Sequence, residues 1–129
     1  MNCFDAHSDI WADVTIRRMR GETNVFHNHH FENIRKGGVE GSVLVVWVDT
    51  LGTRDVETRT RDFFRCVKDE IAESNDLRIV KSYGEMMKAR EEGVFYVFIG
   101  VEGMAYASND PSLARLDEYY DFGARHGIL

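Results

Sequence analysis

A chain of 129 residues with 43% apolar and 12% aromatic residues can bury one ordinary hydrophobic core, so we expect a single domain over residues 1–129. The formal net charge of −6 is spread along the chain without a basic stripe, which excludes nucleic acid as a partner. The first residues lack the positive and apolar regions of a signal peptide, and no apolar run reaches membrane-spanning length, so we expect a cytoplasmic protein with no membrane partner.

The first 48 residues predict two strands with a short helix between them. Residues 2–6 have the pattern of a short strand. Residues 41–48 predict a second strand whose apolar run does not alternate, so both of its faces must be covered, which is typical of a parallel sheet between helices. Residues 29–36 have helical character, and Gly37 and Gly38 supply a stop.

The next helix has the clearest amphipathic pattern in the chain. Phe63, Phe64, Val67 and Ile71 recur at helical spacing within residues 55–73, and charged residues occupy the other face. We therefore expect this helix to cover one face of the sheet.

A third strand follows a second, shorter helix. After a brief extended stretch at residues 77–80, Ser82 and Glu85 form a capping box that opens a helix, and Gly93 ends it. Residues 94–99 are again apolar without interruption, which indicates a second buried parallel strand.

The last segment predicts one more helix and the start of a fourth strand. Asp110 is expected to cap the helix with Pro111 at its first position, Gly123 stops it, and residues 126–129 begin the strand. This alternation of strands and helices predicts an α/β fold with about four parallel strands. A closed eight-stranded barrel needs about 250 residues, so the chain is either a small open sheet or the first half of something larger.

Two short motifs at strand ends carry the residues that favour metal chemistry. Asp5, His7 and Asp9 would point to one side if the first strand stays extended through Asp9, and His7 with Asp9 offers the nitrogen and oxygen ligands that zinc accepts. Glu102 follows the third strand between two glycines. Because parallel strands end at one edge of a sheet, we expect Glu102 to emerge beside His7. The alternative to a metal site is that His7 and Asp9 form a structural pair and that Glu102 is a solvated side chain at the start of a loop.

These motifs carry a resemblance to a known family. Three segments share it: residues 5–9 (Asp-Ala-His-Ser-Asp), residues 100–103 (Gly-Val-Glu-Gly), and residues 110–116 (Asp-Pro-Ser-Leu-Ala-Arg-Leu) continuing to 123–125 (Gly-Ala-Arg). In this order and at these spacings the chain resembles the membrane (renal) dipeptidase family of zinc peptidases. The resemblance spans nearly the whole chain and is far more specific than the His-x-Asp pair alone.

The resemblance implies a fold, a cofactor and a reaction. The fold would be the N-terminal half of a (β/α)8 TIM-type barrel. The family site holds two zinc ions, with His7 and Asp9 matching ligands of the first ion and Glu102 matching the carboxylate that bridges both. A hydroxide between the ions hydrolyses a dipeptide substrate. No residue here matches a catalytic or substrate-binding group beyond these metal ligands.

The family takes its remaining metal and substrate ligands from later strands, which this sequence lacks. We therefore expect an incomplete portion of a dipeptidase that pairs as a homodimer or needs a complementing C-terminal half. The alternative function is a catalytically inactive half-barrel whose role is association, because a half barrel leaves its first and last strands open. Another amidohydrolase is a third possibility, although Glu102 and the Asp110–Pro111 segment favour the dipeptidase.

The other polar and thiol side chains have structural interpretations. His27, His29 and His30 match no ligand position of the family, and a surface loop with a helix start explains them. His126 is likewise expected to be structural. Cys3 and Cys66 are far apart in apolar settings, which favours buried free thiols.

Overall fold

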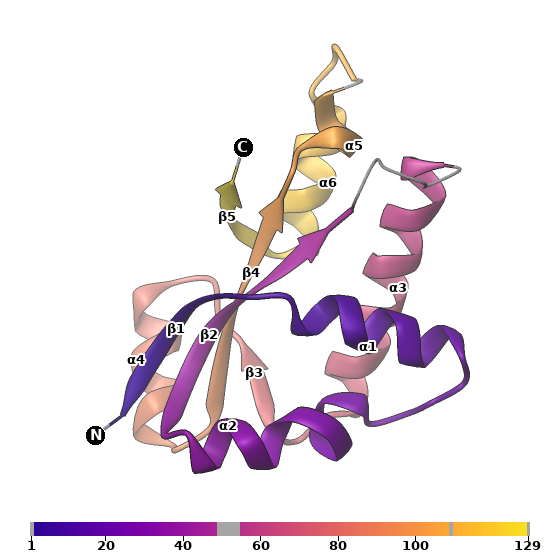
Figure 1. The fold of residues 1–129 in the computed structure, drawn as a ribbon. Coiled ribbons are helices and arrows are strands. Elements are labelled where there is room, and N and C mark those ends of the chain that lie inside the picture. Colours follow the sequence, from indigo (N-terminus) through magenta and orange to yellow (C-terminus); the bar gives the residue numbers. More distant parts are fainter. Residues whose placement is uncertain (1, 49–54, 109, 129) are drawn as a thin grey trace.

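The chain folds around one five-stranded parallel sheet (Figure 1). The computed structural model describes residues 2–48, 55–108 and 110–128. The strands are β1 (Cys3–Ser8), β2 (Val39–Trp47), β3 (Leu77–Ile79), β4 (Phe95–Glu102) and β5 (Ala124–Ile128). β1 pairs with β2 and β2 with β4. The expected parallel α/β arrangement is confirmed.

β3 and β5 share the second edge of β4. β3 pairs with the first part of that strand, where Leu77 lies opposite Phe95, and β5 pairs with its last part, where Ile128 lies opposite Glu102. The four longer strands β1, β2, β4 and β5 therefore follow one another across the sheet in chain order. This is the order in which strands of a parallel barrel are laid down.

Six α-helices and one π-helical turn surround the sheet within the described residues. They are α1 (Ile10–Met19), the π-helical turn η1 (His27–Phe31), α2 (Glu32–Lys36), α3 (Val56–Glu73), α4 (Tyr83–Glu91), α5 (Ala105–Ser108) and α6 (Ala114–Phe122). No helix in this part of the chain is long and apolar enough to cross a membrane.

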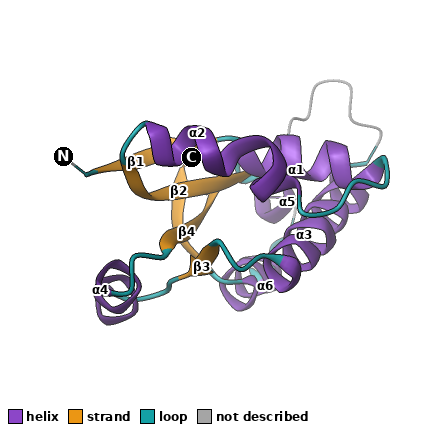
Figure 2. Cartoon of the chain, turned by 90° about the horizontal axis from the view of Figure 1, so that it is seen from below, coloured by secondary structure: helices purple, strands orange, loops and turns teal. Residues whose placement is uncertain are grey.

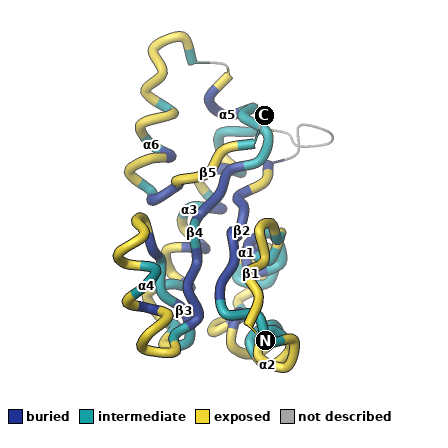
Figure 3. Tube along the Cα trace, turned by 90° about the vertical axis from the view of Figure 1, so that its left-hand side faces the viewer, coloured by how far each residue is buried: buried dark blue, intermediate teal, exposed yellow. Residues whose placement is uncertain are grey.

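The main core lies between the sheet and the pair α1 and α3. Leu44 and Ile99 project from the sheet toward Trp11 of α1 and Phe63 of α3, and all four are almost fully buried. Burial of each such side chain contributes about 1.5–3 kcal/mol before chain entropy is counted. Figure 3 shows that β2 and β4 are buried in the interior, whereas β1, most of β5 and much of the helices are exposed.

The opposite face of the sheet is covered in its lower part by α4, which lies across the strands from α3 (Figure 2). Tyr96 of β4 packs there with Ala89 of α4 and with Val80. Gly41 of β2 lies beneath the Tyr96 ring, and a Cβ at Gly41 would come within 2.2 Å of it. Toward the carboxyl ends of β2 and β4 this face carries Trp47 and Glu102, both of which are partly exposed.

A buried ion-pair network joins α1 to α3. The Arg18 guanidinium donates to Glu70 at 2.7 Å and to both carboxylate oxygens of Glu73 at 2.7 and 2.8 Å. The second oxygen of Glu70 accepts the backbone N–H of Phe26 at 2.7 Å. The Arg18 hydrogen bonds lower the pKa of Glu73 to about 2. This network fixes the helix that begins directly after Asp9.

Several expected boundaries differ from the structure. The helix expected to begin at Asp110 and Pro111 begins at Ala114, because the Asp110 carboxylate closes a turn by accepting from the backbone N–H and hydroxyl of Ser112 at 2.9 and 2.6 Å. Leu113 then has a φ of 62°, a left-handed conformation outside the helix. The predicted last strand begins earlier, at Ala124, and its expected end at residue 129 lies outside the described residues.

The helices α1 and α5 and the exposure of the Cys3 thiol were not expected from the sequence. α1 carries the buried Trp11 and Val14, but its β-branched residues weaken the helical signal. α5 is a single short turn. Both cysteines are free, and burial raises the pKa of the Cys66 thiol, whereas Cys3 is exposed, so the expectation of a buried thiol is wrong for Cys3.

Candidate metal centre

His7 reaches the site through an irregularity in β1. Between the pairs Asp5–Ser42 and Ser8–Leu44, β1 advances three residues while β2 advances two, so β1 contains one extra residue. The Asp5 carboxylate accepts the backbone N–H of His7 at 3.2 Å across this bulge. A bulge of this kind re-aims side chains at a strand end. Here it turns His7 toward the carboxyl end of β4, while Asp5 is engaged with the backbone.

Asp9 lies at the start of α1, where the strand has already ended. Its φ and ψ of −88° and 17° are not extended, so the expectation that Asp5, His7 and Asp9 share one face of a continuous strand is wrong. The turn nevertheless places Asp9 Oδ1 3.8 Å from His7 Nε2. The Asp9 side chain makes no capping hydrogen bond, so its oxygens remain free for a ligand, and the helix dipole of α1 favours its negative charge.

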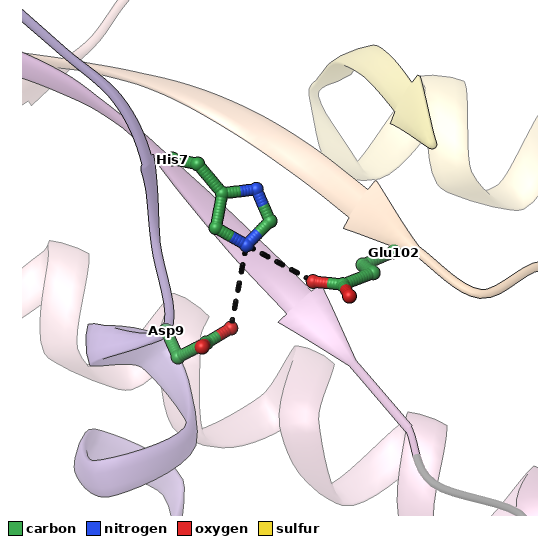
Figure 4. A group of neighbouring side chains, drawn as sticks. All are labelled: His7, Asp9 and Glu102. Carbon is green, nitrogen blue, oxygen red and sulfur yellow. Dashed lines mark ion pairs between the residues drawn. The ribbon is translucent and has the colours of Figure 1, made fainter. Parts of the chain in front are cut away.

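Glu102 is the last residue of β4 and is far from His7 in the sequence. Its Oε2 lies 3.0 Å from His7 Nε2, so His7 stands between two carboxylates (Figure 4). Parallel pairing with β2 places Glu102 level with Trp47. The expectation that His7 and Glu102 emerge at the same sheet edge agrees with this geometry.

The arrangement fits a divalent metal ion. One ligand atom from each of His7, Asp9 and Glu102 lies within 4.8 Å of the other two, and within the described ranges no other group of His, Cys, Asp and Glu meets this condition. Donors around a tetrahedral zinc stand roughly 3.4 Å apart, from bond lengths of about 2.1 Å, so small side-chain movements suffice. One imidazole nitrogen with two carboxylates is a zinc-type donor set.

The three side chains are open to solvent, with exposed fractions of 41% for His7, 62% for Asp9 and 35% for Glu102. Three protein donors leave at least one coordination position of a zinc ion free, which is how catalytic zinc sites differ from structural ones. The site therefore has room for water and for a substrate group.

The other histidine cluster does not enter this site. On η1, His29 pairs with Glu22 at 2.8 Å and His30 with Asp13 of α1 at 2.9 Å, while His27 pairs with Asp76. These pairs connect η1 with neighbouring segments of the fold. The structure therefore places the cluster apart from His7, Asp9 and Glu102.

Sequence reasoning did not identify Trp47 as a neighbour of the site. Val43 and Val45 lie beside Gly100, so alternation along β2 and β4 puts Trp47 and Glu102 on that same face. The Trp47 side chain is 37% exposed. The residues of β2 are apolar on both faces of the strand, so the sequence alone does not show which of them face the site. The pairing of β2 with β4 shows it.

The structure is thus a parallel α/β sheet with a His–Asp–Glu cluster, a candidate metal site, at the carboxyl ends of its strands. Residues 1–128 match the model of the membrane dipeptidase family, peptidase family M19. The chain belongs to this family. A search of curated proteins finds no match.

Two solved structures show how the fold compares. The chain is similar to a dipeptidase AC of family M19, with a TM-score of 0.80 and 13% identity over 98% of this chain and 42% of that one. It is also similar to a metallopeptidase from Rhodobacter sphaeroides bound to a phosphinate mimic of the dipeptide L-Ala-D-Ala, with a TM-score of 0.79 and 12% identity over 98% of this chain and 44% of that one. The chain thus matches half of the TIM-barrel-like fold and spans less than half of each neighbour's length.

Proposed function

We propose that this protein supplies the metal-binding part of a zinc-dependent dipeptidase. One observation carries the proposal: His7, Asp9 and Glu102 bring three ligand atoms within 4.8 Å of one another at the carboxyl ends of β1 and β4. Membership of a metallopeptidase family supports a peptidase, and the dipeptide mimic bound to the Rhodobacter sphaeroides relative supports dipeptides as the substrate class.

The proposed roles follow from the position of each side chain. His7 and Asp9 would hold one zinc ion together with Glu102, whose Oε2 faces His7. Glu102 would be the carboxylate shared with a second ion in the proposal. When bound, zinc supplies Lewis acidity that polarises the amide carbonyl and makes hydroxide available near neutral pH.

The reaction itself is amide hydrolysis. Water adds its oxygen to the carbonyl carbon, the C–N bond breaks, and a proton passes to the leaving amine, so a dipeptide gives two amino acids. Within this chain, the two carboxylates and the imidazole would hold the ion at the carboxyl ends of the strands, where Trp47 lies opposite Glu102. The donors for the rest of a binuclear site are proposed to come from complementing strands.

Metal binding provides the first test. In a native mass spectrum recorded with added Zn²⁺, we expect zinc on the wild-type chain and its loss from Glu102→Gln. Glu91 is exposed and takes part in no ion pair with described residues, so Glu91→Gln is a matched control that should retain zinc. Equal zinc occupancy in Glu102→Gln and Glu91→Gln would refute the assignment of Glu102.

Hydrolysis of L-X and D-X dipeptides with added zinc provides the second test. We expect turnover only when a second copy or a complementing chain closes the barrel. Zinc-dependent turnover by a monomeric chain would contradict the proposed incompleteness, and turnover that persists in Glu102→Gln would contradict the proposed site.

A second candidate function is an inactive half-barrel whose role is self-association. Within the described residues, β1 pairs only with β2, and β5 only with β4, so each has an unpaired edge. Phe4 of β1 is 42% exposed although it contacts the Tyr96 ring. Such edges favour pairing with another chain. Light scattering should show a dimer, and a monomer at tens of micromolar would count against a homodimer.

A further inference from the structure

Trp47 is an exposed aromatic residue at the end of β2, and no described residue accounts for its position. Its side chain is 37% exposed, whereas Trp11, the other tryptophan of the chain, is fully buried in the main core. Phe4 of β1 is similarly exposed, but its ring stacks on that of Tyr96 with 5.9 Å between the ring centroids. Trp47 makes no ring contact or hydrogen bond with the described residues. Packing within this part of the chain therefore does not explain the exposed indole.

The strand register places Trp47 beside Glu102. The two residues lie directly opposite each other on the paired strands β2 and β4, and they project from the same face of the sheet. Neighbouring strands stand about 4.8 Å apart, so the two side chains begin about that far from each other. His7 comes from β1, on the other side of β2, and its Nε2 lies 3.0 Å from Glu102 Oε2. The His7–Glu102 pair therefore crosses β2 near its carboxyl end, where Trp47 stands (Figure 4).

The surface next to Trp47 on this face is apolar. Val43 and Val45 of β2 share the face with Trp47 and are buried. A Cβ on Gly100 of β4 would lie within 2.9 Å of both valine side chains, so these valines cover the space over Gly100. The indole thus stands between an apolar floor and the polar cluster that would hold the ion. Small-molecule sites combine an apolar lining with a few polar groups in this way.

We propose that Trp47 is a specificity-determining residue of the dipeptidase, and that its indole contacts an apolar side chain of the dipeptide whose amide lies at the ion. The inference rests on the proposed function, since Trp47 has this role only beside a metal-bound dipeptide. A flat aromatic face gains more contact from a large apolar side chain than from a methyl group, so dipeptides with a large apolar residue are preferred over Ala-Ala. Trp47 selects the substrate and takes no part in breaking the amide bond.

The test measures the affinity of three phosphinate mimics of dipeptides, for Ala-Ala, Phe-Ala and Ala-Phe, by isothermal titration calorimetry with saturating Zn²⁺. We expect Trp47→Ala to weaken at least one phenylalanine mimic by about tenfold and the Ala-Ala mimic by less than about twofold, because apolar contacts in a fitted pocket discriminate by roughly 10–200-fold. Trp47→Phe keeps an aromatic face and should retain most of the preference. Tyr83→Ala is the control, since Tyr83 is 73% exposed on α4, over the lower part of the sheet, and should change no affinity.

Tryptophan fluorescence gives an independent readout, because only Trp47 of the two tryptophans is exposed. A phenylalanine mimic should shift the emission of the wild type and leave that of Trp47→Phe unchanged. If Trp47→Ala, shown by circular dichroism to be folded, binds all three mimics as the wild type does, the inference is overturned and the proposed function stands. Weaker Zn²⁺ binding by Trp47→Ala also overturns it, since Trp47 would then support the cluster itself. If the zinc-loaded wild type binds no mimic, the inference and the proposed function both fail.

Discussion

Replacing Arg18 by alanine removes the cation that neutralises Glu70 in the packing between α1 and α3. The Arg18 side chain is 9% exposed and that of Glu70 is fully buried. After the substitution, Glu70 retains the backbone N–H of Phe26 but has lost its charge partner. Breaking a buried ion pair on one side costs about 3–5 kcal/mol, because an uncompensated charge stays in the interior. We expect a loss of about 3 kcal/mol in the free energy of unfolding.

Urea denaturation followed by circular dichroism measures this loss as a lower midpoint at an unchanged slope. Arg20→Ala is the matched control, since Arg20 is exposed at the end of α1 and makes no ion pair with the described residues, and it should change stability by less than about 0.5 kcal/mol. A loss below about 1 kcal/mol for Arg18→Ala would refute the reasoning, because it would mean that water reaches Glu70 and screens its charge.

Three further predictions test the packing, the ion pair and the metal centre. Gly41→Ala should destabilise the fold by about 1–3 kcal/mol, read from thermal denaturation, because the new methyl group overlaps the Tyr96 ring, and an unchanged melting temperature would contradict this. The Arg18 hydrogen bonds lower the pKa of Glu73 from 4.5 to about 2, so their stabilisation is present above pH 4.5 and is lost as the pH falls toward 2. In urea titrations, the free energy of unfolding of the wild type should therefore exceed that of Glu73→Gln by less and less over this pH range. A difference that stays constant would argue against the ion pair. Zn²⁺ at a hundred times its dissociation constant should stabilise the wild type by about 2.7 kcal/mol in calorimetry and leave Glu102→Gln unaffected, whereas equal shifts would place the ion elsewhere.

The part of the site that the sequence predicts depends on one robust rule, that parallel strands end at a common edge. The short strand pattern at residues 2–6 and the unbroken apolar run at residues 94–99 located β1 and β4, so His7 and Glu102 were expected together although they are distant in sequence. Asp9 was expected nearby for the wrong reason. It reaches His7 through a bulge and a helix start, which no alternation pattern reveals.

Other features were hidden because tertiary contacts decide them. α1 is helical largely because Trp11 and Val14 bury against β2 and α3, which overrides the weak helical propensity of its β-branched residues. Asp110 satisfies a cap pattern in sequence, but the same carboxylate bonds a nearby hydroxyl and closes a turn instead. The neighbourhood of Trp47 depends on strand register, which emerges only when the sheet is assembled.

The residues of the candidate metal centre lie far apart in the sequence, and this has a consequence for assembly. His7 and Glu102 are 95 positions apart (102 − 7 = 95), with β2 between their strands. An ion bound by both would act as a reversible cross-link across a long loop, whose closure in the unfolded chain costs entropy. Such an ion would therefore bind after β4 has docked on β2, and zinc binding would report that this part of the sheet has formed.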